Sequence, residues 1–195
     1  MTPFFNCSTL ILAAGFSQRM GSPKALLKFN ETDIFLTQII SQFLNFGIQN
    51  VVVVVNPQVN ELLQKEHPGV YNISKICVNH YPQKGRNVSI KKGIEEITTD
   101  YCFIHNVDNP FVSDVTLKLL YNNKEKASVI IPCFKGKGGH PILINKKVLD
   151  SIIKMPENIS LRDFLLQFSS LRIECQEKNI STNISTPEDY KQYFA

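Results

Sequence analysis

The 195-residue sequence lacks any apolar stretch long enough to span a membrane, and its cysteines form no Cys-x-x-Cys pair. The first absence argues against a membrane protein. The second argues against a redox or metal site built from cysteine, so we predict buried free thiols in a reducing cytoplasm. The cysteines are Cys7, Cys77, Cys102, Cys133 and Cys175.

The sequence also lacks a basic stripe interleaved with aromatic residues, because its Lys and Arg residues are scattered and its formal net charge is only +4. This argues against nucleic-acid binding. No basic residue precedes the apolar run from Phe4 to Ala14, so we interpret the run as part of the folded chain and not as a secretory signal. No linker, repeat or low-complexity tract divides residues 1–195, which predicts a single domain.

Apolar strand-like runs alternate with helical patterns along the chain. The predicted strands are residues 8–13, 51–55, 75–78, 101–106 and 128–132. Apolar residues at helical spacing predict helices around residues 34–44 and 88–97. The five consecutive valines at 51–55 indicate a central parallel strand that is buried on both faces. We therefore predict an α/β fold, a doubly wound, mostly parallel open sheet with helices on both faces.

The most informative segment is LILAAGFSQRMGSPK at 10–24, where an apolar strand leads into a glycine-containing loop. Backbone N–H groups of such a loop converge on an anion, and Arg19 and Lys24 can neutralise oxygens that the amides do not reach. The spacing of Gly15 and Gly21 matches neither the P-loop nor the dinucleotide pattern. The segment predicts a cradle for a nucleoside triphosphate.

Ligands bind beyond the carboxyl ends of the strands in an open parallel sheet. Besides the loop at 15–24, the residues at predicted strand ends are Asn56, Asp108 and the segment before His140, and we expect them to converge. A carboxylate at this edge can hold a hard cation such as Mg²⁺ that bridges phosphate oxygens. From the residues alone, a turn or helix cap is the favoured role of Asp108, since Asn109 and Pro110 follow it.

Four segments, in this order, resemble the motifs of the MobA-like NTP transferases, which attach a nucleotide to molybdopterin. They are residues 10–24, VDNPFV at 107–112, GGHP at 138–141 and NISTPEDY at 183–190. The resemblance implies a fold like that of the nucleotide-diphospho-sugar transferases, Mg²⁺ as cofactor and a cytoplasmic location. It also implies a nucleoside triphosphate and a molybdopterin-like phosphorylated acceptor as substrates, with a recipient enzyme of the molybdenum hydroxylase type as partner.

The resemblance assigns roles to individual residues. The catalytic candidates are Arg19 and Lys24, which contact the phosphates, and Asp108, which binds the metal together with Asn183. The nucleotide-binding candidates are Leu12, Ala13, Ala14, Gly15, Ser17, Arg19, Lys24, Asn56, Gly85, Ser89 and Asp108. The acceptor-binding candidates are Gly139, His140 and Arg162, and His140 either touches the acceptor phosphate or braces its loop.

Some residues carry local predictions or depart from the family. Ser185 stands where relatives usually have a carboxylate or carboxamide, and Arg162 alone has a counterpart in the segment 156–165. Thr186 and Pro187 are typical of a helix start, and we interpret Asn87 as the N-cap of another helix. We predict that the remaining histidines are surface or satisfied core residues; they are His67, His80 and His105.

The predicted activity is Mg²⁺-dependent transfer of CMP from CTP to molybdopterin with release of pyrophosphate. CTP is favoured over GTP because guanylyl enzymes of the family generally have glycine where this chain has Ala14, and the added methyl narrows the space beside the base. One alternative is an enzyme of the same fold that activates a sugar, alditol or isoprenoid phosphate. The other is a protein that binds the cofactor or a nucleotide without catalysis.

Overall fold

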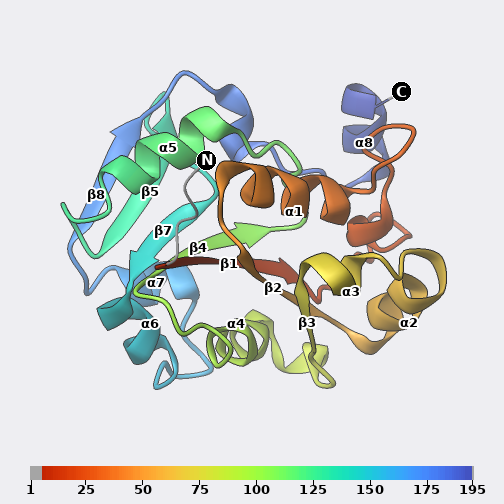
Figure 1. The fold of residues 1–195 in the computed structure, drawn as a ribbon, viewed down its shortest axis with the longest axis horizontal. Helices are drawn as coiled ribbons and strands as arrows, with labels where there is room; N and C mark the ends of the chain where they lie inside the picture. The colour runs from red at the N-terminus through yellow and green to blue at the C-terminus, as the bar shows by residue number, and fades with distance from the viewer. Residues whose placement is uncertain (1–5, 195) are drawn as a thin grey trace.

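The computed structural model describes residues 6–194 of the chain (Figure 1). Within this range one sheet contains β1 (Cys7–Ala13), β2 (Asn50–Val55), β3 (Lys75–Val78), β4 (Tyr101–Asn106), β5 (Val129–Phe134), β6 (Lys137–Gly138), β7 (Ile142–Asn145) and β8 (Ser170–Glu174). Phe4 and Phe5 of the N-terminal apolar run lie outside the described residues, and the rest of the run contributes to β1.

The strand order is β3-β2-β1-β4-β7-β5-β6, and β8 pairs with β5 off this path. In the order β3-β2-β1-β4 each strand is parallel to the next, and β8 is parallel to β5. Only the short strands β6 and β7 run antiparallel to their neighbours in the described sheet. The predicted mostly parallel open sheet is confirmed.

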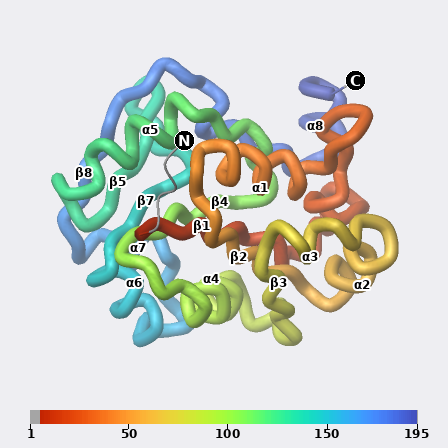
Figure 2. The backbone as a smooth tube through the Cα atoms, in the orientation of Figure 1, coloured from red at the N-terminus to blue at the C-terminus, as the bar shows by residue number. Residues whose placement is uncertain are grey.

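Helices cover both faces of the sheet (Figures 1 and 2). Buried or partly buried residues of α1 (Phe35–Phe46), α2 (Pro57–Glu66), α3 (Val70–Ile73), α5 (Asp114–Asn122) and α8 (Pro187–Phe194) belong to one apolar cluster. Those of α4 (Arg86–Ile94), α6 (Lys146–Ile152) and α7 (Leu161–Leu165) belong to the other. Three short 3₁₀ helices complete the described elements: η1 (Lys24–Leu26), η2 (Pro82–Lys84) and η3 (Lys178–Ser181).

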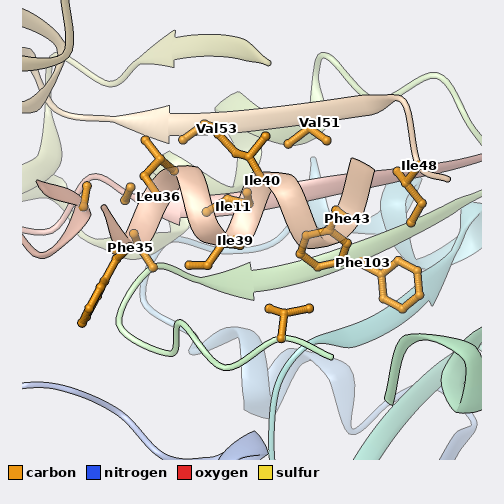
Figure 3. Packing of buried hydrophobic residues seen from close by; sticks show 14 of the residues in the cluster. Ile11, Phe35, Leu36, Ile39, Ile40, Phe43, Ile48, Val51, Val53 and Phe103 are labelled. Carbon is orange, nitrogen blue, oxygen red and sulfur yellow. The ribbon is translucent and has the colours of Figure 1, made fainter. Parts of the chain in front are cut away.

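The side chains of each central strand alternate between these two clusters. Ile11 and Val53 pack under α1, whereas Leu10 and Val52 face the side of α4. Figure 3 shows the residues of α1 lying against Ile11, Val53 and Phe103. Because both faces of the sheet are covered by helices, the central strands contain continuous runs of apolar residues. This made them easy to predict from the sequence.

The C-terminal helix α8 lies beside the segment that follows the N-terminal loop (Figures 1 and 2). The hydroxyl of Tyr190 donates to the carbonyl of Lys28 at 2.8 Å, and the rings of Phe29 and Phe194 are 5.4 Å apart. Thr186 accepts a hydrogen bond from the backbone N–H of Asp189 at 3.2 Å, which confirms the predicted helix start at Pro187. The contact between Tyr190 and Lys28 joins the last motif of the chain to the segment just after the first motif.

All five cysteines are buried and free, as predicted. His105 is buried, which confirms a core position; its Nε2 lies 2.7 Å from the carbonyl oxygen of Asn109, whereas its Nδ1 has no hydrogen-bond partner in the described part of the chain, so only one ring nitrogen is satisfied. The interpretation of Asn87 as a helix N-cap was wrong, because α4 already begins at Arg86 and the Asn87 amide donates to the backbone carbonyls of Pro156, Glu157 and Ile159. Among the described residues, no helix combines the length and apolar character needed to cross a bilayer.

Candidate functional site

A cleft of about 560 Å³ opens at the carboxyl ends of β1 and β4. Its lining residues come from the loop after β1, the start of α4, the end of β4 and the turn before α8. They are Leu12, Ala13, Ala14, Gly15, Phe16, Ser17, Gln18, Arg19, Lys24, Ala25, Val59, Pro82, Gly85, Arg86, Ser89, Asn106, Val107, Asp108 and Ser185. The volume is within the range of ligand-binding pockets.

The loop after β1 is held in a turn by its own backbone. Ser17 adopts a left-handed conformation with φ of 53°, and its carbonyl accepts from the N–H groups of Met20 and Gly21 at 2.9 and 3.1 Å. Its hydroxyl accepts from the backbone N–H of Lys24 at 3.1 Å. The side chain of Met20 is buried and fixes the turn to the core. The loop therefore presents Arg19 and Lys24 to the cleft from a defined backbone.

Asn56 holds this loop in place from the neighbouring strand end. It is buried, and its Nδ2 donates to the carbonyls of Ala14 and Gly15 at 3.3 and 3.4 Å. Its Oδ1 accepts from the N–H of Val59 at 2.8 Å and so caps α2. Asn56 is the one member of the predicted nucleotide-binding set that is not among the lining residues. The structure gives it bonds to the loop backbone.

Lys24 is the centre of the polar contacts in the cleft. Its Nζ lies 3.1 Å from Oδ2 of Asp108 and 3.1 Å from Oγ of Ser185. The lysine side chain is 14% exposed and the aspartate side chain 26%, so the ion pair is partly shielded from water. Three segments far apart in sequence, at Lys24, Asp108 and Ser185, are thus brought to one point.

The start of α4 forms the opposite wall of the cleft. Gly85, with φ of 100°, precedes the helix, and Ser89 is buried with its hydroxyl 2.9 Å from Nδ2 of Asn79. Nη2 of Arg86 donates to Oδ1 of Asn106 at 2.7 Å. Neither Arg86 nor Asn106 was predicted from the sequence as a site residue. Arg86 follows a predicted site glycine, but only its contact with Asn106 at the end of β4 shows that it reaches the cleft.

Residues 9–172 of the chain match the MobA-like NTP transferase domain. The chain belongs to this family. It is 30% identical over 183 residues to the molybdenum cofactor cytidylyltransferase of Escherichia coli K12, covering 93% of this chain and 92% of that one. It is 26% identical to a probable molybdenum cofactor guanylyltransferase of Bacillus mycoides, covering 95% and 94% of the two chains. The protein is a nucleotidyltransferase, as the sequence predicts.

A solved structure supports the fold. The crystal structure of a Mycobacterium tuberculosis protein in complex with manganese aligns with a TM-score of 0.76, covering 96% of this chain and 97% of that one. The two sequences are only 13% identical, so this likeness concerns the fold. It agrees with the fold that the resemblance to the MobA-like NTP transferases implies.

Of the two metal-binding candidates of this MobA-like transferase only Asp108 lines the cleft, although the N–H of Ile184, next to Asn183, donates to the carbonyl of Asp108 at 2.7 Å. Oδ1 of Asp108 is buried and has no hydrogen-bond partner, whereas Asn183 is exposed and is not among the lining residues. Ser185 lines the cleft instead. Within residues 6–194 no group of three or more His, Cys, Asp or Glu side chains could hold a metal ion. A free carboxylate oxygen fits a divalent cation, but the other ligands would have to be water and substrate oxygens.

The acceptor-binding candidates lie outside the lining residues of the cleft. Arg162 is exposed on α7, and the N–H of Gly139 donates to the carbonyl of Pro132 at 2.8 Å. A Cβ on Gly139 would lie 2.5 Å from the carbonyl oxygen of Ile180, so this glycine permits a close backbone approach. His140 contacts the site through its Nε2, which is 3.0 Å from Nδ2 of Asn106.

Burial changes the protonation of the groups around Asn106. It lowers the pKa of His140 to about 4, and the positive charge of Arg86 adds to this effect. Loss of hydration also lowers the pKa of Arg86, while Asp108 raises it. Arg86 has accessible surface because it faces the open cleft, yet protein surrounds it on the other sides. At neutral pH the site therefore contains a neutral His140 and a charged Arg86.

Proposed function

We propose that this nucleotidyltransferase transfers CMP from CTP to the phosphate of molybdopterin and releases pyrophosphate. The observation that carries the proposal is Lys24, held by Asp108 and Ser185 at the end of the loop after β1. In this position its ammonium group faces a cleft that also receives Arg19. Two cations at the rim of a strand-end cleft suit a polyanionic ligand.

The chemistry needs positioning and charge neutralisation. An oxygen of the acceptor phosphate attacks the α-phosphorus of CTP, the bond from that phosphorus to the bridging oxygen breaks, and pyrophosphate leaves with the bonding electrons. The acceptor phosphate is largely ionised near neutral pH, so no general base is required. Lys24 would stabilise the charge that develops at the reacting phosphorus, and Arg19 would hold the triphosphate.

A divalent cation, Mg²⁺ in our proposal, fits the free oxygen of Asp108. This buried oxygen has no partner, and Lys24 bonds only the other oxygen of the same carboxylate. Asp108 would hold the cation, which when bound would offset the negative charge of the triphosphate. The manganese bound by the structural relative from M. tuberculosis is consistent with a divalent metal in this fold.

The preference for CTP rests on Ala14. This residue is 5% exposed, lines the cleft and packs with the apolar cluster on the side of α4. Its methyl group removes space beside the base, which favours the smaller cytosine ring over guanine. The relatives include both activities, since the one named a cytidylyltransferase is 30% identical over 183 residues and one named a probable guanylyltransferase is 30% identical over 148 residues. The base preference therefore rests on Ala14 and not on sequence identity.

The base preference is tested by Ala14→Gly, with Ala13→Gly as a matched control. Both alanines line the cleft, but Ala13 packs with the cluster on the side of α1. We expect Ala14→Gly to raise kcat/KM for GTP relative to CTP and Ala13→Gly to leave this ratio unchanged. An unchanged ratio in Ala14→Gly would remove the basis for choosing CTP.

The activity is tested first by ligand-dependent thermal stability with CTP, GTP, ATP and UTP, each with and without Mg²⁺. A nucleotide at a hundred times its Kd stabilises by about 2.7 kcal/mol, which raises Tm by roughly 5 to 10 °C for a chain of this length. Pyrophosphate release is then measured with molybdopterin and with sugar or isoprenoid phosphates. Release only with molybdopterin supports the proposal. Release only with another phosphate corrects the acceptor, and binding without release contradicts catalysis.

A further inference from the structure

We propose that Arg86 binds the phosphate of the acceptor and that His140, acting through Asn106, positions it. This inference rests on the proposed function, because it concerns the second substrate of the same site. The contacts form one chain: Nη2 of Arg86 is 2.7 Å from Oδ1 of Asn106, and Nδ2 of Asn106 is 3.0 Å from Nε2 of His140.

The sheet order separates this chain of contacts from the cradle for the triphosphate. Strand β4 has β1 on one side and β7 on the other. The loop with Arg19 and Lys24 follows β1, Asn106 ends β4, and His140 comes two residues before β7. Arg86 reaches the end of β4 from the start of α4. The cleft therefore has cations from two separate elements, the loop after β1 and the start of α4.

The hydrogen bonds that link Arg86, Asn106 and His140 fix which atom of each side chain faces its neighbour. A guanidinium has only donors, so the atom of Asn106 that it contacts must be the carbonyl oxygen. The amide nitrogen of Asn106 is then the atom that faces His140, and Nε2 of His140 must accept its hydrogen bond with a free lone pair. His140 thus works as an acceptor for Asn106. It does not serve as a cation for the substrate phosphate.

Arg86 keeps donors for a substrate. One nitrogen is bound to Asn106, and the guanidinium has five N–H groups in a planar fork that matches a phosphate. Lys24 is already bonded to Asp108 and Ser185, so its role is with the triphosphate and the metal ligand. An acceptor phosphate between these two cations would lie near the α-phosphorus of a nucleotide in the loop, as in-line attack requires.

The main test compares Arg86→Gln with wild type by steady-state kinetics. Loss of a charged hydrogen bond predicts a roughly tenfold to hundredfold rise in KM for the phosphorylated acceptor. We expect KM for CTP to stay within about twofold, because the triphosphate contacts remain. Lys84→Gln is the control, since it removes an exposed positive charge two residues away that does not line the cleft. A rise in KM for CTP instead, or no change in either constant, overturns the proposal.

The positioning role is tested by two substitutions of His140. Glutamine retains an acceptor oxygen for Nδ2 of Asn106, whereas leucine does not. We expect His140→Gln to keep the acceptor KM near the wild-type value and His140→Leu to raise it with KM for CTP unchanged. If His140 itself bound the phosphate, both variants would lose acceptor affinity to the same degree, which would contradict the positioning role.

A binding measurement separates this inference from the proposed activity. Inorganic phosphate is titrated into protein saturated with Mg²⁺ and a CTP analogue that cannot transfer CMP, in wild type and in Arg86→Gln. Phosphate binding that is lost in Arg86→Gln supports the subsite even if molybdopterin gives no pyrophosphate. Equal binding in the two proteins, or none in wild type, overturns it whatever the acceptor proves to be.

Discussion

Replacing Gly93 with alanine is expected to destabilise the protein and weaken nucleotide binding together. Gly93 is the penultimate residue of α4, and a Cβ there would lie 2.2 Å from Cδ1 of Leu10 and 2.8 Å from Cγ2 of Val54. Both neighbours are 0% exposed, so neither side chain can turn into solvent. The helix must move away from β1 and β2 to admit the methyl group.

Two effects of opposite sign set the magnitude. Overpacking of a core costs about 1–3 kcal/mol, whereas alanine in place of glycine stabilises a helix by about 1 kcal/mol. Because both neighbouring side chains are fully buried, we expect an overpacking cost in the upper part of that range, about 2–3 kcal/mol. After the gain of about 1 kcal/mol from helix propensity, the expected net loss of unfolding free energy is about 1–2 kcal/mol. Because Ser89, one of the predicted nucleotide-binding residues, lines the cleft from the same helix, displacement of the helix should also raise the Kd for CTP.

The assay is urea unfolding together with CTP titration, and Gly69→Ala is the control. A Cβ on Gly69 would meet no atom within 4 Å beyond its chain neighbours, and the residue has a φ of −59°, so alanine fits there. We expect Gly69→Ala to change the unfolding free energy by less than about 0.5 kcal/mol. Stabilisation of Gly93→Ala by about 1 kcal/mol with unchanged CTP affinity would refute the reasoning, since helix propensity alone would then explain the result.

Three further predictions concern the polar groups. Lys24→Met should lower kcat by roughly 10²- to 10³-fold, as for loss of one donor to a developing charge, with a smaller change in KM for CTP; the pyrophosphate assay would contradict this if KM changed more than kcat. Asp108→Asn should abolish the part of the CTP thermal shift that depends on Mg²⁺, and a retained metal dependence would place the metal elsewhere. Burial lowers the pKa of His105 to about 3 and of His140 to about 4, so the unfolded state binds more protons below about pH 6.5. Unfolding free energy should thus fall on acidification from pH 6.5 towards 4, by up to about 1.4 kcal/mol per pH unit for each histidine, and a smaller slope in His105→Gln would confirm the source.

The fold was predictable where burial on both faces produced continuous apolar runs. The predicted strand at 51–55 falls within β2 (Asn50–Val55), and those at 75–78 and 101–106 have the bounds of β3 and β4. Strand β8 (Ser170–Glu174) was not predicted, because polar residues interrupt its apolar ones and only Leu171 and Ile173 are partly buried. The antiparallel direction of β7 was not predicted either, since an apolar run does not record which way its strand runs.

The site was predictable where one stretch of chain supplies the geometry. The loop after β1 contains its glycines and cations within a few residues, and ten of the eleven predicted nucleotide-binding residues line the cleft. Asn56 shows the limit of arguing from strand ends, because its location was correct but its side chain turns to the loop backbone. Arg86 and Asn106 acquire their contact only because α4 packs against β1 and β2 with its first residues near the end of β4, which no local pattern specifies.

The charge balance of the cleft connects its two substrates. Its charged lining residues are Arg19, Lys24 and Arg86 against the single carboxylate of Asp108 within the described chain. One carboxylate binds a divalent cation weakly, so the remaining ligands must come from phosphate oxygens and water. Metal and nucleotide binding are then coupled, and by linkage each raises the affinity for the other to the same degree. In the proposed reaction Arg19 and Lys24 contact the triphosphate, which leaves Arg86 as the cation of the cleft for the acceptor phosphate.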